Sequence, residues 1–156
     1  MNIIDVFTQA TPKLIGGLTV TVEVTVISLV LALIVGILVC LMNISGNKVL
    51  SGIARFYIWI IRGTPMLVQA FYIYFAMPQL IQGITGAPFR ISVFIASIIT
   101  LTINAGAYIS EIFRGSINSV PKGQMEASRS LGLNYSQSMR KIILPQAVRI
   151  CLPTLV

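Results

Sequence analysis

The sequence predicts an all-α fold: a polytopic bundle of membrane helices with three complete spans and the start of a fourth. Of its 156 residues, 56% are hydrophobic and only 10% are charged, with a mean hydropathy of +0.91. A soluble domain needs more charge to cover its surface. Three uncharged runs of 20 to 24 residues match the roughly 20 residues that a helix needs to cross a bilayer. A lone strand cannot satisfy its backbone in lipid, so we expect these runs to be helices.

Composition also excludes several classes of function. The chain has no histidine, so the commonest metal ligand and acid–base residue at neutral pH is absent. Cys40 and Cys151 lie far apart in apolar surroundings, which argues against a disulfide framework. The net charge of +7 comes from basic residues between the apolar runs, a pattern of membrane topology rather than of nucleic-acid binding. We therefore expect no enzyme, no metal site and no nucleic-acid partner.

The first span follows a polar segment. Residues 1–17 are expected to be a polar lead-in that forms a short interfacial helix. They lack the basic region that begins a cleavable signal peptide, so we do not expect one here. Val24–Asn47 is an uncharged run of 24 residues and is predicted to be the first span. Glu23 is interpreted as a carboxylate favoured near a helix N-terminus, with a role in a transport pathway as the alternative. Gly36 allows close approach of a second helix.

The second span is expected after a turn and a break. The segment Asn43–Ser51 contains the turn, and Ile53–Ile61 carries aromatic side chains between two arginines, as at a membrane interface. Pro65 restricts the residue before it, so Arg62–Pro65 is predicted to kink or restart the helix. Met66–Phe89 is an uncharged run of 24 residues. Its second half is predicted to be loop because it contains Pro78, Gly83, Gly86 and Pro88.

The third span carries a line of polar residues. Ile91–Ser110 is an uncharged run of 20 residues. Spacings of four, four and three place four polar residues on one helix face: Thr100, Asn104, Tyr108 and Glu111. Polar groups within a membrane are costly unless they face protein or water. This face is therefore either a packing seam or the lining of a substrate path, and the sequence leaves both readings open.

A basic segment, Lys122–Pro145, is predicted to form two short helices. Pro121 suits a first helical turn, and Gly132 can adopt the left-handed conformation that stops the first helix. Asn134 can cap the second helix, with Gln137 three residues later in the capping-box position. Pro145 disturbs or ends that helix, because it removes a backbone donor and crowds the preceding turn. Pro145–Val156 then begins another apolar segment of 12 residues.

This segment resembles a known transporter element. It holds, in order and at the family's spacing, Glu126-Ala127-Ser128, Gly132 and Ile142-Ile143-Leu144-Pro145. The pattern is similar to the cytoplasmic EAA loop of bacterial ABC-importer permeases, with Ser128 in place of the second alanine. Arg62-Gly63-Thr64-Pro65 likewise resembles the branch that carries polar amino acids such as histidine, glutamine and arginine. The resemblance implies one permease domain over residues 1–156, with residues 114–145 as the loop that contacts an ATPase.

The same resemblance implies roles and partners. The expected ATPase-coupling residues are Gly123, Glu126, Ala127, Ser128, Gly132, Leu144 and Pro145, and ATP itself binds the partner, so this chain has no cofactor. Cytoplasmic ABC ATPases, an extracytoplasmic amino-acid-binding protein, and a second permease copy or paralogue are the implied partners, besides membrane lipid. Permeases of this family usually have five spans, so we expect the chain to be C-terminally short.

Charge predicts the orientation in a bacterial cell membrane. If the loop is cytoplasmic, nine of the eleven basic residues fall inside, and only Lys13 and Arg90 fall outside. The N-terminus is then outside. Two alternatives remain at this stage: an ion-coupled secondary transporter or channel that uses Glu23 or Glu111, and an inactive permease fragment.

Overall fold

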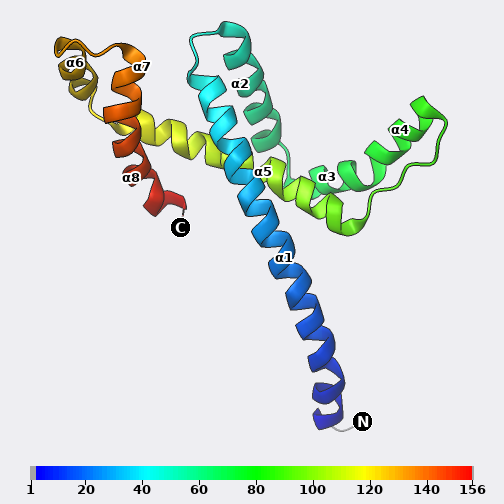
Figure 1. Cartoon of the computed structure of the whole chain (residues 1–156). Coiled ribbons are helices and arrows are strands. Elements are labelled where there is room, and N and C mark those ends of the chain that lie inside the picture. The colour runs from blue at the N-terminus through cyan, green and yellow to red at the C-terminus, as the bar shows by residue number, and fades with distance from the viewer. Residues whose placement is uncertain (1–2, 156) are drawn as a thin grey trace.

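The computed structural model describes the backbone of residues 3–155 and the side chains of residues 10–155. Every element in this part of the chain is helical (Figure 1), as the sequence predicts. Two helices are long and apolar enough to cross a membrane: Ala10–Ile44 within α1, and α5. The elements, in chain order, are α1 (Ile3–Ile44), α2 (Lys48–Gly63), α3 (Met66–Phe71), η1 (Tyr72–Ala76), α4 (Met77–Thr85), α5 (Val93–Ser119), α6 (Lys122–Ser130), α7 (Tyr135–Ser138), η2 (Met139–Ile143) and α8 (Leu144–Leu155).

The expected lead-in is not a separate helix. The helix α1 runs without interruption from Ile3, with Pro12 inside it, and its N-terminal half extends away from the other helices (Figure 1). The alternating stretch after Leu18 is helical rather than extended, and its threonine hydroxyls donate to carbonyls four residues earlier. Thr19, Thr21 and Thr25 make these bonds at 3.1, 3.0 and 2.7 Å. The hydroxyls are thereby satisfied within the helix itself.

A three-residue turn joins α1 to α2. Asn47 caps α2, and its side-chain oxygen accepts from the backbone N–H of Val49 at 2.9 Å and of Leu50 at 3.4 Å. The Ser51 hydroxyl donates to the Asn43 carbonyl at 3.1 Å, which ties the start of α2 to the end of α1. The turn is therefore shorter than the predicted segment, because its last residues already belong to α2.

Most of the second half of Met66–Phe89 is helical, so the loop prediction is wrong up to Thr85 and holds only for residues 86–89. Helical structure continues through η1 and α4 to Thr85, and Gly86, at φ +70°, ends it. Pro78 lies inside α4, two residues beyond the π-helical turn η1. A π turn re-registers the backbone carbonyls ahead of a proline that can neither donate nor tolerate crowding by the preceding turn. The chain therefore passes the proline without leaving the helix.

The tightest packing lies between α1 and α5, the pair of helices with the most extensive contact. Small residues recur every four positions along the buried side of α1: Ser28, Ala32, Gly36 and Cys40. A Cβ added at Gly36 would lie 2.5 Å from the Ile109 Cγ2 and 3.2 Å from the Gly106 carbonyl oxygen. Small residues at such positions let two helices approach within backbone contact. The predicted role of Gly36 is thus confirmed.

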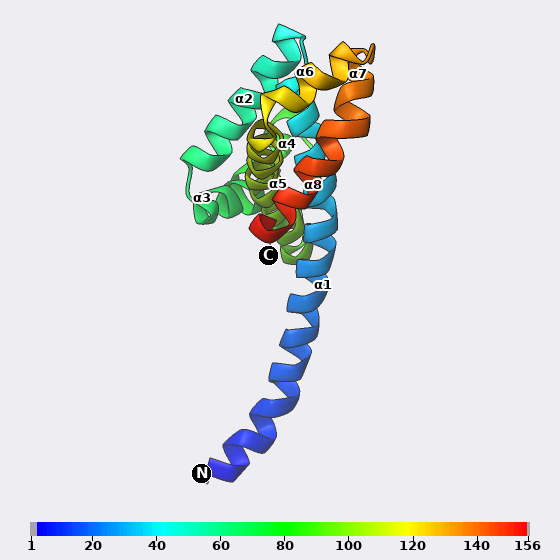
Figure 2. The same ribbon diagram turned by 90° about the vertical axis from the view of Figure 1, so that its left-hand side faces the viewer.

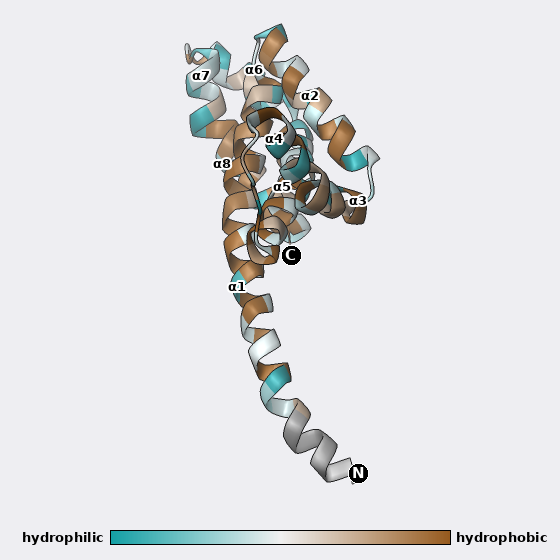
Figure 3. Ribbon diagram, turned by 90° about the vertical axis from the view of Figure 1, so that its right-hand side faces the viewer, coloured by the Kyte–Doolittle hydropathy of each residue, from teal (hydrophilic) through white to brown (hydrophobic). Residues whose placement is uncertain are grey.

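The C-terminal third folds back on the end of α5. In both views, α6 and α7 lie at the same end of the molecule as the α1–α2 turn, and the N-terminus lies at the other (Figures 1 and 2). A small apolar core of Val120, Ile143 and Ala147 holds these elements together, with Met125 of α6 packed against it. Hydrophobic residues dominate most of α1, whereas hydrophilic residues gather on α7 (Figure 3).

Candidate functional site

The helix α6 is a short, firmly terminated element. Pro121 precedes its first turn, and Leu131 closes its last. Gly132 has φ +86°, as the sequence predicts, and its N–H donates to the Arg129 carbonyl at 3.0 Å. The Leu133 N–H donates to the Ser128 carbonyl at 3.3 Å, which completes a Schellman motif. The left-handed conformation of Gly132 is therefore part of the motif that ends α6.

Two sides of α6 differ in what they contact. Gly123, Glu126 and Ala127 are exposed, and a Cβ added at Gly123 would meet open space. Ser128 is 1% exposed, and its hydroxyl donates to the Met125 carbonyl at 2.7 Å. Its small size serves packing within this chain, and its role in coupling to a partner stays a prediction. The outward side of α6 presents a carboxylate beside small residues.

The second helix of the segment begins as predicted. Asn134 and Gln137 form a reciprocal capping box, with both bonds at 2.9 Å. Helical structure then runs from α7 through the π turn η2 into α8, so Pro145 disturbs the helix without ending it. Leu144 is half-buried and Pro145 is exposed. As at Pro78, the proline stands two residues beyond the π turn, which supports the same re-registration.

The polar face of α5 meets the break between α2 and α3. Asn104 donates from its amide to the Gln69 Oε1 at 3.1 Å. Arg62 lies 3.3 Å from the Glu111 carboxylate, and its guanidinium carbon is 5.2 Å from the centre of the Tyr108 ring. These five residues form what we call the polar junction. The buried Thr100 does not join it, because its hydroxyl donates to the Ala96 carbonyl of its own helix at 2.7 Å.

Glu111 is held by two arginines. Arg114 donates to both carboxylate oxygens at 2.8 Å, in addition to the contact with Arg62. The side chains of Arg62 and Glu111 are 42% and 22% exposed, so the pair is partly hydrated and contributes little stability by itself. A carboxylate with two bound guanidiniums is a poor proton carrier, because losing its charge would leave both cations unpaired. This arrangement disfavours the ion-coupled alternative at Glu111.

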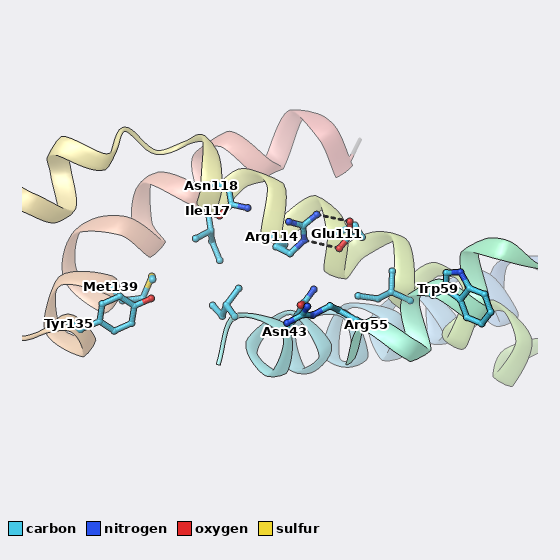
Figure 4. Close-up of a pocket in the computed structure, with 11 residues that line it drawn as sticks. Asn43, Arg55, Trp59, Glu111, Arg114, Ile117, Asn118, Tyr135 and Met139 are labelled. Carbon is cyan, nitrogen blue, oxygen red and sulfur yellow. Dashed lines mark hydrogen bonds and ion pairs between the residues drawn. The ribbon is translucent and has the colours of Figure 1, made fainter. Parts of the chain in front are cut away.

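A groove of about 780 Å³ lies beside this ion pair, between α5, the end of α1, the middle of α2 and the start of α7 (Figure 4). Arg114 and Glu111 line its α5 wall, and Asn43 and Arg55 lie on the facing side. Arg55 donates to the Ser51 hydroxyl at 2.6 and 3.1 Å, so its position is fixed. No cluster of three or more His, Cys, Asp or Glu residues occurs in the described part of the chain. Glu23 lies exposed on α1, away from this groove.

The sequence interpretation missed Gln69, which joins the two sides of the polar junction. A signal was present, since an isolated amide in the apolar run after Pro65 needs a buried partner. The partner itself was not predictable, because Asn104 is 35 residues away along the chain. The four-residue polar pattern on α5 was predicted as one face, and three of its members do contact the α2–α3 break.

Comparison with known proteins gives consistent matches. A family model described as binding-protein-dependent transport system inner membrane component matches residues 28–156. The glutamine transport system permease protein GlnP of Escherichia coli (strain K12) is 40% identical over 94% of this chain and 64% of its own length. The arginine transport system permease protein ArtQ of Bacillus subtilis (strain 168) is 39% identical, over 93% and 64% respectively.

A solved structure agrees with these relatives. The crystal structure of an amino acid ABC transporter with histidines superposes with a TM-score of 0.88 at 36% identity, over 99% of this chain and 69% of that chain. The chain spans 64% of the length of each of the two permease proteins above. The match over residues 28–156 includes α2 to α8 and the C-terminal part of α1. The chain belongs to the family of binding-protein-dependent transport system inner membrane components.

Proposed function

We propose that this chain is the membrane-spanning permease subunit of an ABC importer for polar amino acids. The observation that carries the proposal is the helix α6. It follows the C-terminal end of α5, ends in a Schellman motif and presents Glu126 and Ala127 outward. Family membership supports a location in the membrane and a role in transport. The relatives named for glutamine and arginine transport support polar amino acids as the substrate class.

The partners follow from the same function. A pair of cytoplasmic ABC ATPases binds and hydrolyses ATP, and an extracytoplasmic binding protein delivers the amino acid. A second copy of this chain, or a related permease, completes the pathway. The family description names binding-protein-dependent transport, which supports the extracytoplasmic binding protein as a partner. The permease itself performs no covalent chemistry and holds no cofactor.

The proposed topology has the N-terminus outside and residues 114–145 in the cytoplasm. The α1–α2 turn and α6–α7 lie at one end of the molecule (Figures 1 and 2), which supports a shared side of the membrane. Nine of eleven basic residues fall on that side under this orientation. Met66–Thr85, bent at η1, is proposed as the second of three spans, and α8 as the start of a fourth.

Coupling is proposed to work as a rigid-body lever. Only Val120 and Pro121 separate α5 from α6, and Val120 is buried in the small core that also holds α8. Movement of α6 therefore pulls on α5 and α8 together. Rigid elements that switch between two arrangements transmit such movement over tens of ångströms. Gly123 and Ala127 leave room for the ATPase surface, and Glu126 offers it a charge.

Four other residues of the segment are proposed to shape it. Ser128 packs α6 against this chain, and Gly132 sets the angle at which the chain leaves α6. Leu144 and Pro145 lie at the start of α8, where the π turn η2 redirects the helix toward the membrane. These roles concern the stiffness and direction of the loop, whereas Glu126 and Ala127 provide its contact surface.

The test is charge reversal at Glu126. Among the side chains of residues 10–155, both salt bridges use Glu111 and leave the Glu126 carboxylate available to a partner. Glu126→Lys should lower substrate-stimulated ATP hydrolysis of the reconstituted complex by at least about tenfold, since a lost charged contact costs about 1.5–3 kcal/mol. Gln124→Lys is the matched control, because it adds a positive charge to α6 and leaves the carboxylate in place. Unchanged stimulation in Glu126→Lys, with normal membrane insertion, would refute the coupling role.

A further inference from the structure

The Gln69 side chain of α3 lies between the end of α2 and the middle of α5. Its Nε2 donates one hydrogen to the Ile61 carbonyl at 2.8 Å, and the other is shared between the Thr64 hydroxyl at 2.8 Å and the Thr64 carbonyl at 3.1 Å. Its Oε1 accepts from Asn104 at 3.1 Å. The first three bonds reach back across the break between α2 and α3, and the fourth reaches across to α5. One amide side chain thus joins both sides of the break to a neighbouring helix.

The break explains why the α2 side needs a donor. Pro65 has no N–H, and α3 begins a new helical register at Met66, so the last carbonyls of α2 lose their helical partners. Backbone carbonyls that lose their helical partners need a donor from another protein group or from water. Gln69 provides the donor from one turn into α3. The Gln69 side chain therefore has two roles. Its bonds to Ile61 and Thr64 join the two sides of the break, which we call the pin, and its bond to Asn104 joins them to α5, which we call the bridge.

The helix on the other side of this bridge is the one that leads to α6. Asn104 lies within α5, whose C-terminal end connects through two residues to the coupling segment. A second connection to α5 is made by Arg62 at the end of α2, which contacts Glu111 and Tyr108. Tyr57 adds a third link at 2.6 Å to the Ile103 carbonyl. Both sides of the break are thereby attached to the helix that α6 would move.

We propose that Gln69 is a positioning residue for transport: it makes the α2–α3 break and α5 move as one unit when α6 is displaced. The inference rests on the proposed function. An amide is required because the site uses a donor and an acceptor on the same side chain. Glutamate has no donor when charged, leucine has neither group, and asparagine is one methylene too short to reach both sets of partners.

The first test reads the break directly and does not depend on transport. Spin labels at the exposed positions Ile60 of α2 and Leu80 of α4 report the distance across the break in lipid nanodiscs. The natural cysteines, Cys40 and Cys151, are buried. Gln69→Leu should broaden the distance distribution to about twice its wild-type width, since it releases the pin, whereas the exposed control Gln79→Leu should not. Equal distributions for both variants and wild type would overturn the inference.

The second test separates the bridge from the pin in the reconstituted transporter. Gln69→Leu and Asn104→Leu should each lower substrate-stimulated ATP hydrolysis about three- to twentyfold at unchanged basal hydrolysis, the range for interhelical hydrogen bonds in membranes. The exchange Gln69→Asn with Asn104→Gln conserves the combined length of the two amides and should restore part of the stimulation, because the bridge to α5 forms again while the bonds to Ile61 and Thr64 stay lost. A purely structural role predicts loss of folded protein in all variants and no rescue by the exchange.

These outcomes are distinguishable from failure of the proposed function. If the wild-type complex takes up no polar amino acid, the proposed function is wrong, and the spin-label distances still decide whether Gln69 pins the break. If the wild type is active and the exchange is as poor as the single leucine variants, the bridge to Asn104 is not what positions the helices.

Discussion

Replacing Gly36 by alanine should destabilise the protein more than any comparable change at another helical glycine. The added Cβ would lie 2.5 Å from the Ile109 Cγ2 and 2.8 Å from the Ile109 Cβ, and it would also press on the Gly106 carbonyl oxygen at 3.2 Å. The two contacts below 3.0 Å are with the branched Cβ of Ile109 and the methyl group on it, so they cannot be relieved by rotating a flexible chain end. The α1–α5 pair must therefore separate.

The size of the effect follows from two opposing contributions. Overpacking a tight interface costs about 1–3 kcal/mol. Exchanging glycine for alanine in a helix is by itself favourable by about 0.5–1 kcal/mol. Gly52 measures the second contribution alone, because a Cβ added there meets nothing within 4 Å. Because the glycine-to-alanine gain is common to both variants, the expected difference in unfolding free energy between Gly36→Ala and Gly52→Ala is the overpacking cost, about 1–3 kcal/mol, with Gly52→Ala the more stable.

Unfolding in mixed micelles, followed by helical circular dichroism, provides the assay. Ile109→Ala in the Gly36→Ala background should rescue only part of the loss, since it removes the 2.5 Å contact and keeps the Cβ at 2.8 Å. If Gly36→Ala is as stable as Gly52→Ala, or if Ile109→Ala makes the double variant still less stable by its full single-variant cost, the close α1–α5 approach is not what holds these helices together.

Three further outcomes are expected. Gly132→Val should lower the yield of assembled transporter more than Gly132→Ala, and Gly132→Asn least, because φ +86° suits asparagine better than a β-branched residue; equal yields in detergent extracts would contradict the left-handed stop. Asn104→Cys should resist a membrane-impermeant thiol reagent. Tyr108→Cys should react with it, because Tyr108 is 47% exposed and lies beside the charged Arg62. If only lipid-soluble reagents label the two cysteines, the polar face of α5 points into lipid and the prediction is wrong. Tyr57→Phe should cost about 1 kcal/mol by removing the hydrogen bond from α2 to the Ile103 carbonyl of α5. Tyr72→Phe, at a residue 56% exposed, should cost nothing measurable in the same micelle assay.

Local signals in the sequence were reliable where a single residue dictates backbone geometry. The stop at Gly132, the capping box at Asn134 and the restart after Pro65 all form as predicted. Each depends on conformations or donors that belong to a few consecutive residues, so no distant contact can change them. The all-helical class is equally local, because an apolar run in lipid has no other way to satisfy its backbone.

Proline was the weakest of these signals. Pro78 and Pro145 were expected to mark a loop and to disturb or end a helix, yet both lie in continuous helical structure behind a π turn. Whether a helix stops at proline or re-registers depends on whether the residues beyond it have something to pack against. Pro78 is buried, and the small core of Val120, Ile143 and Ala147 holds both sides of η2 in place. Those contacts come from other parts of the chain.

The sequence by itself determined that this is a helical membrane protein, which residues carry the EAA pattern, and that four polar residues share a face of α5. Only the tertiary structure decided what that face does. Asn104 is satisfied by Gln69, Glu111 by two arginines, and Thr100 by its own helix. It also decided that Ser128 is turned into this chain while Glu126 faces out. Spacing along a helix fixes which residues share a side, but the side that is buried depends on where the other helices lie, and that is set by packing between residues far apart in the chain.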